Sequence, residues 1–545
     1  MKRLFKMLFL ILLFYSEALA QQEDTLSKID DIELITKYKP ILVETEKIYV
    51  LPEISNNPID LPVMQYDLPD LLPTIGNNYS PIRPVSLKKE KPPILFGNFA
   101  KLGFGNYSSP YAQLYLHSLE SRKYSYGINL LHHSAKGPKS GELKNVQVSQ
   151  NDFNLFGERF LRKGVLSANF NYNRQGFTRY GYPTDAADLG MKELSNVFHL
   201  GSGNIFFSSI DERKKNGFLL GTSFSSFGND VCSELDFMID GGVKWSGRNF
   251  QFDWNSKVDL TNFSKDTQTF NRTFVHTFPK ISFRKKYFEI ALGARATLLS
   301  GDDSLAENLY ITPYAFSKYK IAPELFIFGE LDGGLVKNSF QNLARTNPFI
   351  NNHFTLTNTF NAFHLKVGAS GNLHNFSYSG NLFLGLQNNR VMFATDSSKF
   401  RAFDVLYDNL TQSGFQAQMG YTFNQKGFVN AKLTLTDYKT EKYTAAFHLP
   451  NTQFEMQARY YWNEKFIVKS NGLFLSERLN RNEKDRQKTN QIPAFFDLSF
   501  GLEYLHKKTL TFFLEANNVL NKKYQFWANH PRFGLNVLGG VSLSI

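Results

Sequence analysis

The feature that most constrains the fold of this chain is an alternation of apolar and polar residues with a period of two, which runs from about residue 94 to the last residue. In the window 250–260, for example, Phe252 and Trp254 are separated by Asp253. Successive side chains of a β-strand point to opposite faces, so this period predicts strands with one apolar and one polar face. The same pattern recurs in the windows 166–173, 288–297, 363–370, 376–384, 454–462 and 496–504.

The alternating runs are long for strands. Strands of soluble proteins usually have about five or six residues, whereas these runs have about nine or more, enough to cross a bilayer when tilted. A soluble antiparallel fold, with one face on a core and the other in solvent, would show the same alternation and remains the alternative. After the N-terminus, no stretch of about 18 or more apolar residues predicts a helical span. An exported chain without such a span is either soluble or a closed barrel.

The connections between the runs alternate between short and long. Short, often basic connections are predicted at 121–123, 162–164, 213–217, 246–249, 284–286, 318–320, 371–375, 424–427, 463–465 and 506–508. The connections between them are mostly longer and more polar, such as 176–195, 340–352 and 477–491. Ten short turns separate eleven hairpins and so give about 22 strands. Short turns on one side with long loops on the other are typical of outer-membrane barrels. We therefore predict an all-β fold, a transmembrane antiparallel β-barrel over residues 94–545.

Residues 1–20 have the composition of a secretory signal peptide. A basic start with Lys2 and Arg3 is followed by an apolar stretch over 7–15 and by small residues at Ala18 and Ala20. Cleavage is expected after Ala20. No cysteine follows that point directly, so a lipid-anchored form of the signal is not expected.

Residues 21–93 differ from the rest of the chain because they hold ten of its 20 prolines and show no sustained period. Proline lacks a backbone donor and is excluded from helix interiors and central strands. We predict an extended segment, periplasmic or lumenal. Its apolar residues are too many for a bare linker, so it should bind either the lumen wall or a protein partner.

Few residues of the sequence are candidates for catalysis or metal binding. Cys232 is the single cysteine, so no disulfide within the chain and no cysteine metal site can form. His132 and His133 are adjacent, which allows only one of them to face a given site, and Asp302 and Asp303 fit a polar turn better than a cation site. No glycine-rich phosphate loop or catalytic motif stands out. The sequence therefore predicts no catalytic, cofactor-binding or metal-binding residue, no cofactor and no enzyme activity, and leaves the substrate-binding residues open.

Near the end of the chain, the strand 510–516 stops at "NNVLNKKYQFWANHPRFG" and is followed by a final alternating strand over 535–545. This pattern resembles the C-terminal signature of TonB-dependent receptor barrels, whose positions are occupied here by Asn518, Leu520, Tyr524, Trp527, Pro531 and Gly534. Upstream, "IPAFFDLSFGLEY" is similar to the penultimate hairpin strand of that family. The resemblance covers about residues 445–545 and implies an outer-membrane barrel that binds a solute or passes it across the membrane.

Two features depart from that family. Its barrels usually end in an aromatic residue, whereas Ile545 only keeps the lipid-facing period. Its members also carry a globular plug that starts with a TonB box, and residues 21–93 are too few and too rich in proline for that plug, although a box-like stretch lies around Ile32 to Ile35. Without a plug, TonB-coupled transport does not follow from the resemblance. A barrel this wide would leak if empty, so residues 21–93, inward-folded loops or a partner protein must fill it.

The formal net charge of +12 is spread over turns, loops and lumen faces. No basic helix or aromatic-interleaved patch suggests a nucleic-acid partner. Basic turns fit contact with outer-membrane lipids, and basic lumen faces fit attraction of anionic solutes. Three functions remain open at this stage. The chain is a plugless receptor-like barrel, a non-transporting scaffold of a larger outer-membrane complex that docks a periplasmic or surface protein through residues 21–93, or an outer-membrane enzyme, which no motif supports.

Overall fold

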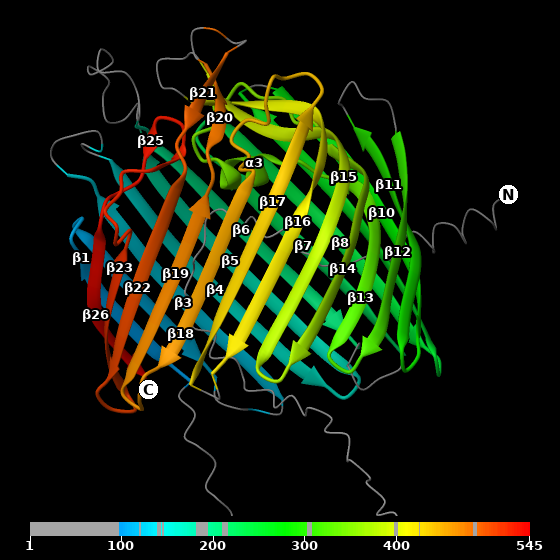
Figure 1. Cartoon of the computed structure of the whole chain (residues 1–545), viewed down its shortest axis with the longest axis horizontal. Helices are drawn as coiled ribbons and strands as arrows, with labels where there is room; N and C mark the ends of the chain where they lie inside the picture. Colours follow the sequence, from blue (N-terminus) through cyan, green and yellow to red (C-terminus); the bar gives the residue numbers. More distant parts are fainter. Residues whose placement is uncertain are drawn as a thin grey trace, which may run out of the picture. The chain divides into compact units, whose positions relative to one another are not determined.

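The chain forms a closed antiparallel barrel of 22 strands in the computed structural model (Figure 1). The structure describes residues 97–544 except 119–120, 122, 139–142, 144–145, 181–194, 210–215, 267, 302–307, 397–401, 424–425, 483–484 and 486–487. The predicted signal peptide, the proline-rich segment 21–93 and Ile545 lie outside the described residues. The prediction of an all-β barrel of about 22 strands is confirmed.

The barrel strands follow one another around the ring in chain order. Their bounds are β1 (Phe99–Gly105), β2 (Ser109–His117), β3 (Tyr124–Lys136), β4 (Gln147–Leu161), β5 (Gly164–Thr178), β6 (Ser195–Ser208), β7 (Asn216–Gly228), β8 (Cys232–Ser246), β9 (Phe250–Lys265), β10 (Gln268–Arg284), β11 (Phe288–Gly301), β12 (Asn308–Ala322), β13 (Leu325–Val336), β14 (Thr359–Leu373), β15 (Phe376–Thr395), β16 (Phe403–Thr422), β17 (Gly427–Thr440), β18 (Thr452–Tyr461), β19 (Phe466–Leu475), β22 (Phe495–Leu505), β23 (Leu510–Asn517) and β26 (Asn536–Ser544).

The barrel closes between its first and last strands. β1 pairs antiparallel with β26, with Phe99 opposite Ser544 and Gly105 opposite Leu538. The other edge of β1 pairs with β2. Each barrel strand in the described part of the chain therefore has two neighbours, and its backbone groups are satisfied within the ring, as a hydrocarbon environment requires.

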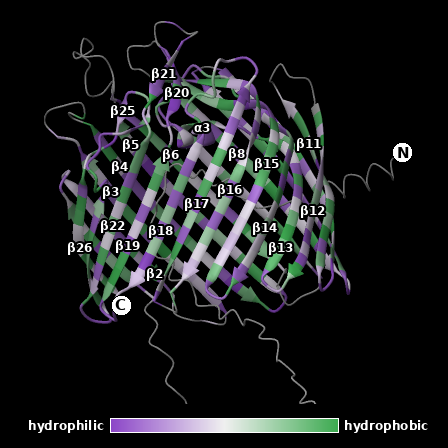
Figure 2. Ribbon diagram, in the orientation of Figure 1, coloured by the Kyte–Doolittle hydropathy of each residue, from purple (hydrophilic) through white to green (hydrophobic). Residues whose placement is uncertain are grey.

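Apolar and polar residues alternate along the barrel strands (Figure 2), and the apolar positions form the outer face of the barrel. Leu382 is 65% exposed, Leu514 49% and Phe170 48%, although all three are large apolar side chains. Such a surface is stable against lipid and unfavourable in water. The polar positions between them face the lumen, where Asp259 and Thr261 are buried. A soluble fold would bury the apolar face, so the soluble alternative is excluded.

Nine of the ten predicted short turns coincide with or overlap connections between barrel strands, all at the end that holds the start of β1. The prediction at 318–320 was wrong, because β12 continues to Ala322 and the turn follows it. Lys318 and Lys320 face the lumen instead, and their Nζ atoms lie 4.4 and 5.9 Å from the ring centroid of Phe326. The lysines pack against an aromatic ring, which a local search for basic turns does not detect.

The opposite end of the barrel carries the long connections, which contain elements of their own. These elements are α3 (Phe340–Thr346), β20 (Arg478–Arg481), β21 (Thr489–Ile492), β24 (Gln525–Trp527) and β25 (His530–Pro531). Figure 1 shows α3 within the outline of the barrel near this end. None of the helices in the described segments is long and apolar enough to span a membrane.

Candidate functional site

Described residues of four long connections pack inward at this end of the lumen. With the adjoining strand ends they form an apolar assembly that we call the lid. The connections are 337–358, 441–451, 476–494 and 518–535. The buried side chains of its core are Phe177, Phe198, Leu200, Phe227, Cys232, Phe263, Phe340, Leu343, Ala344, Ile350, Phe354, Phe393, Phe403, Leu475, Ile492, Phe495, Phe526, Trp527 and Ala528. The sequence allowed three ways to fill the lumen, and one of them, inward-folded loops, is present.

The lid joins β5 to the opposite strand of the ring, β16, at the end of the β15–β16 hairpin that extends beyond β17. Phe177 lies on β5 and Phe403 on β16, eleven positions apart (16 minus 5) in the ring of 22 strands. The ring of Phe349 contacts Phe177 at 5.2 Å between centroids and His530 at 4.1 Å. His530 in turn lies 5.4 Å from Phe403. Aromatic contacts of this kind stabilise a buried cluster beyond its area alone. Two loop residues therefore connect β5 with the extended end of β16, which pairs there with β15 only.

The connection 337–358 is held to the wall by a buried carboxylate. Glu234 of β8 accepts hydrogen bonds from the backbone N–H groups of Phe340 at 2.7 Å and Gln341 at 3.4 Å. These are two of the unpaired donors in the first turn of α3. Ser339 caps the same helix, because its hydroxyl accepts from the N–H of Asn342 at 3.1 Å. The start of α3 is thereby fixed against the barrel wall.

Basic side chains hold the two ends of the same connection. Lys337 Nζ lies 2.6 Å from Asp236 Oδ1 and 2.9 Å from Asp259 Oδ1. Arg272 of β10 is 2% exposed and donates to the carbonyl oxygen of Asn338 at 3.1 Å and to Asn358 Oδ1 at 3.4 Å. A buried charge is tolerated only where such partners replace water. These contacts hold the entry and the exit of the loop together.

Helix α3 buries three residues, Phe340, Leu343 and Ala344. The ring of Phe340 packs against the wall residues Phe227 at 5.1 Å and Phe198 and Phe263 at 6.0 Å between centroids. The helix is short, so this tertiary packing and its caps account for its stability rather than helix propensity.

The residues of the C-terminal signature fold the connection 518–535 into the lid. Asn518 has a positive φ of 49° and donates to the carbonyl oxygens of Lys522 at 2.9 Å and Phe533 at 3.0 Å. Tyr524 donates from its hydroxyl to Asp497 Oδ2 at 2.7 Å, and Trp527 is buried in the lid core. The interpretation of this stretch as a strand end and loop start is confirmed, since β23 ends at Asn517.

His448 is a buried titratable group of the lid. Its Nδ1 lies 2.8 Å from the carbonyl oxygen of Phe393, and its Nε2 accepts from the N–H of Ala528 at 3.3 Å. Nδ1 therefore donates while Nε2 accepts, which only the neutral imidazole can do. Burial, with smaller contributions from Arg478 and His530, lowers the pKa of His448 to about 3.

Arg478 places a positive charge inside the lid. Its Nη2 donates to the carbonyl oxygen of Gln525 at 2.7 Å, and its Nη1 donates to that of Phe526. The guanidinium also lies 5.4 Å from the ring centroid of Phe495. Burial lowers the pKa of Arg478 to about 10. Backbone carbonyls and an aromatic face thus replace a carboxylate partner.

The cations of the lumen wall are largely neutralised by neighbouring carboxylates. Lys469 Nζ lies 2.6 Å from Glu503 Oε1, for example. Further pairs on lumen faces are Lys101 with Glu515, Arg295 with Asp332, Lys366 with Glu330 and Lys280 with Asp253. The lysine bias of the sequence therefore gives these wall positions no net attraction for anionic solutes.

The residues weighed for metal binding do not form a site together. His132 and His133 lie within β3 rather than in a loop, and on opposite faces. His132 Nδ1 lies 2.7 Å from Asn151 Oδ1 on the outside, whereas His133 Nε2 lies 3.2 Å from Ser109 Oγ. Asp302 and Asp303 fall outside the described residues. Within the described ranges, no group of three or more His, Cys, Asp or Glu residues is arranged to hold a metal ion.

The chain is an outer-membrane β-barrel. It has a closed ring of 22 strands, an apolar outer band and its long connections at one end. Solved receptor structures share this fold. The FrpB iron transporter from Neisseria meningitidis (F3-3 variant) matches with a TM-score of 0.66 at 9% identity, over 83% of this chain and 81% of that one. The pyoverdine receptor FpvA from Pseudomonas aeruginosa matches with 0.64 at 10% identity, over 84% and 79%.

The siderophore receptor PiuA from Acinetobacter baumannii matches with a TM-score of 0.61 at 10% identity, over 82% of each chain. No protein-family model and no curated protein matches the sequence. The likeness at these identities concerns the fold, and it agrees with the resemblance carried by the C-terminal residues.

Sequence reasoning did not identify the lid residues as a site. A local signal was present, because the connection 340–352 carries Phe340, Phe349 and Ile350 between two strands. Apolar residues at this density are unfavourable in a solvated loop and indicate a segment that packs against something.

Proposed function

We propose that the protein is a receptor-like outer-membrane barrel that binds a solute or passes it across the membrane, and that the lid is its movable barrier. The observation that carries this proposal is the connection of β5 to β16 through Phe349 and His530. A solute that crosses the lumen must displace this connection. The shared fold with an iron transporter and siderophore receptors supports a transport role.

The construction of the lid suits movement. The barrel is held by continuous strand ladders. The lid is held by side-chain contacts such as those of Glu234, Lys337 and Arg272, and by the short backbone bridge between Ile350 and Phe403. Loops on a rigid scaffold commonly carry gating motions. The lid can therefore shift while the ring of strands stays closed.

The interior of the lid brings together groups that suit ligand recognition. The rings of Phe495 and Phe526 lie 5.4 and 5.6 Å from the buried guanidinium of Arg478. Aromatic faces with a few convergent polar groups are typical of ligand sites. We propose that the lid takes the place of the plug of the receptor family, so that TonB has no plug to pull on.

Replacing residues 338–357 with a six-residue Gly-Ser linker tests the proposal, because Lys337 and β14 stay in place. The variant should assemble and show a higher single-channel conductance in a planar bilayer than the unchanged protein. The same linker inserted at Glu464, in the short turn between β18 and β19, is the matched control and should leave conductance unchanged.

Unchanged conductance in the assembled lid variant would reject the lid as the barrier. If a polypeptide that copurifies with the unchanged protein is also lost from this variant, the scaffold function is favoured instead.

A further inference from the structure

The outer wall of the barrel carries a polar region above its apolar band. On β5, Phe170 and Tyr172 are 48% and 38% exposed on the lipid-facing side. Arg174 follows two residues later, and β5 pairs with β4 and β6 without a register shift. Because residues two apart share a face of a strand, Arg174 points outward, near the long-loop end.

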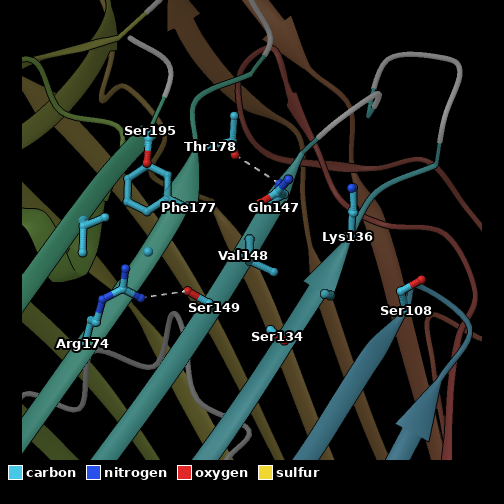
Figure 3. A pocket seen from close by; sticks show the side chains of 13 residues that line it. Ser108, Ser134, Lys136, Gln147, Val148, Ser149, Arg174, Phe177, Thr178 and Ser195 are labelled. Atoms are coloured by element: carbon cyan, nitrogen blue, oxygen red, sulfur yellow. Dashed lines mark hydrogen bonds between the residues drawn. The ribbon is translucent and has the colours of Figure 1, made fainter. Parts of the chain in front are cut away.

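A hollow of about 330 Å³ lies at this position on the outer wall. Figure 3 shows Arg174 and Lys136 on either side of it, with Ser149 between them. Arg174 Nη1 donates to Ser149 Oγ at 3.4 Å. Further hydroxyl groups line the hollow from Ser108, Ser134, Thr178 and Ser195.

The two cations of the hollow differ from those of the lumen. Lumen cations such as Lys101 and Lys469 form ion pairs with carboxylates. Neither Arg174 nor Lys136 forms an ion pair with any residue that the structure describes. Two cations without a carboxylate partner among the described residues, surrounded by hydroxyl groups, are complementary to a phosphate on a polyol, since guanidinium and ammonium groups bind phosphate oxygens strongly.

An apolar groove lies on the same strands, nearer the middle of the wall. It has a volume of about 640 Å³, and its floor includes the small residues Gly157, Ala168 and Gly203. Its sides are formed by larger lipid-facing residues, which are Leu155, Phe170, Ile205, Phe224 and Phe237. Along β5, the groove at Phe170 and the hollow at Arg174 are about 13 Å apart, at 3.3 Å per residue.

We propose that this part of the outer wall binds a phosphorylated glycolipid of the outer leaflet. The phosphate lies between Arg174 and Lys136, the sugar hydroxyls meet the serine and threonine side chains, and an acyl chain lies in the groove. The arrangement selects a lipid, because the cationic hollow stands directly above an apolar groove on the lipid-facing wall. A free phosphate would use only the hollow, and an apolar molecule only the groove.

Native mass spectrometry of the full-length protein, with lipid A as the probe, tests this site. The unchanged protein should retain lipid A through detergent exchange and retain a dephosphorylated form poorly. The double variant Lys136→Gln/Arg174→Gln should retain about tenfold less, as expected for the loss of two charge-assisted contacts. Lys439→Gln is the matched control, because Lys439 is exposed on the outer face of β17 at the same end and lines neither cavity.

Gly203→Leu tests the groove separately. A Cβ at Gly203 meets its nearest atoms at 3.6 and 3.9 Å, which are ordinary contact distances, so a side chain can start there and extend into the groove. This variant should also lose lipid A. The proposal is overturned if the double variant retains lipid A like the unchanged protein, if Lys439→Gln loses as much, if Gly203→Leu loses none, or if millimolar inorganic phosphate binds equally well.

Discussion

The carboxylate of Glu234 accepts a 2.7 Å hydrogen bond from the backbone N–H of Phe340, which lies 106 residues later in the chain. Both groups are buried, and Arg272 lies 4.0 Å from the same carboxylate oxygen. The contact joins a barrel strand to the first turn of α3. It fixes the position of the loop that spans the lumen.

Glu234→Ala should loosen that loop. The Phe340 N–H would lose its acceptor at a cost of about 1–3 kcal/mol, so amide hydrogen exchange over 340–344 should accelerate by roughly 10- to 100-fold. Glu234→Gln keeps one oxygen acceptor and should have a smaller effect. Equal exchange in the alanine variant and the unchanged protein would show that the carboxylate does not hold the helix.

Phe403→Ala should destabilise the lid more than a similar change elsewhere on the same strand. Phe403 is fully buried, and loss of a buried phenyl ring typically costs about 3–5 kcal/mol. Phe415 lies on the outer face of β16 and is 37% exposed, so Phe415→Ala is the control. Bilayer conductance should rise for the first variant alone, and a rise in both would mean that the barrel, not the lid, was damaged.

The lid should weaken on acidification because of His448. Its pKa is lowered from 6.5 to about 3, so the closed lid holds it neutral while an opened lid lets it bind a proton. The stabilisation is complete above about pH 6.5 and is lost as the pH falls toward 3, by at most about 1.4 kcal/mol per unit.

Conductance or exchange at 526–530 should therefore increase between pH 7 and pH 5. His448→Gln keeps a donor and an acceptor without titrating, and should flatten this response. An equally steep response in that variant would assign the effect to another group.

Charge tolerance should differ between the two faces of one strand. Leu382→Arg places a charge on the lipid face near mid-membrane, at a cost of roughly 2–4 kcal/mol. Ser379→Arg places it on the lumen face of the same strand and should cost little. Urea unfolding in lipid vesicles measures both, and similar costs would contradict the assignment of faces.

The proline-rich segment 21–93 remains expected to lie along the lumen wall or a partner subunit. Deleting residues 30–85 should leave the barrel assembled but raise its conductance or release a bound polypeptide. Planar-bilayer recording and copurification test this together. A deletion protein unchanged in both respects would remove the segment from any such role.

The barrel was predictable because its determinants are local. A period of two assigns the faces of Phe170 and Leu382 from neighbouring residues alone, and turns follow from short polar breaks. The turn predicted at 318–320 was wrong because that prediction used neighbouring residues alone. Lys318 and Lys320 pack on Phe326 of the next strand, which local sequence does not reveal.

The lid was not predictable in this way. The contact of Glu234 with Phe340 and the bridge from Phe177 to Phe403 join residues far apart in the chain. The aromatic residues of 340–354 indicated that the loop is buried, but no local feature selects which wall it contacts.

The pairing of β1 with β26 has a consequence for biogenesis. Every other pairing in the ring joins barrel strands that follow one another in the sequence. The β1–β26 pairing instead joins the two ends of the barrel sequence and places Gly105 opposite Leu538. The entropic cost of loop closure grows with the logarithm of loop length, so local hairpins form more readily than this pairing. The edge of β1 therefore lacks its second partner until β26 joins the ring, and a chain truncated before Asn536 would leave an open sheet edge that a bilayer does not accommodate.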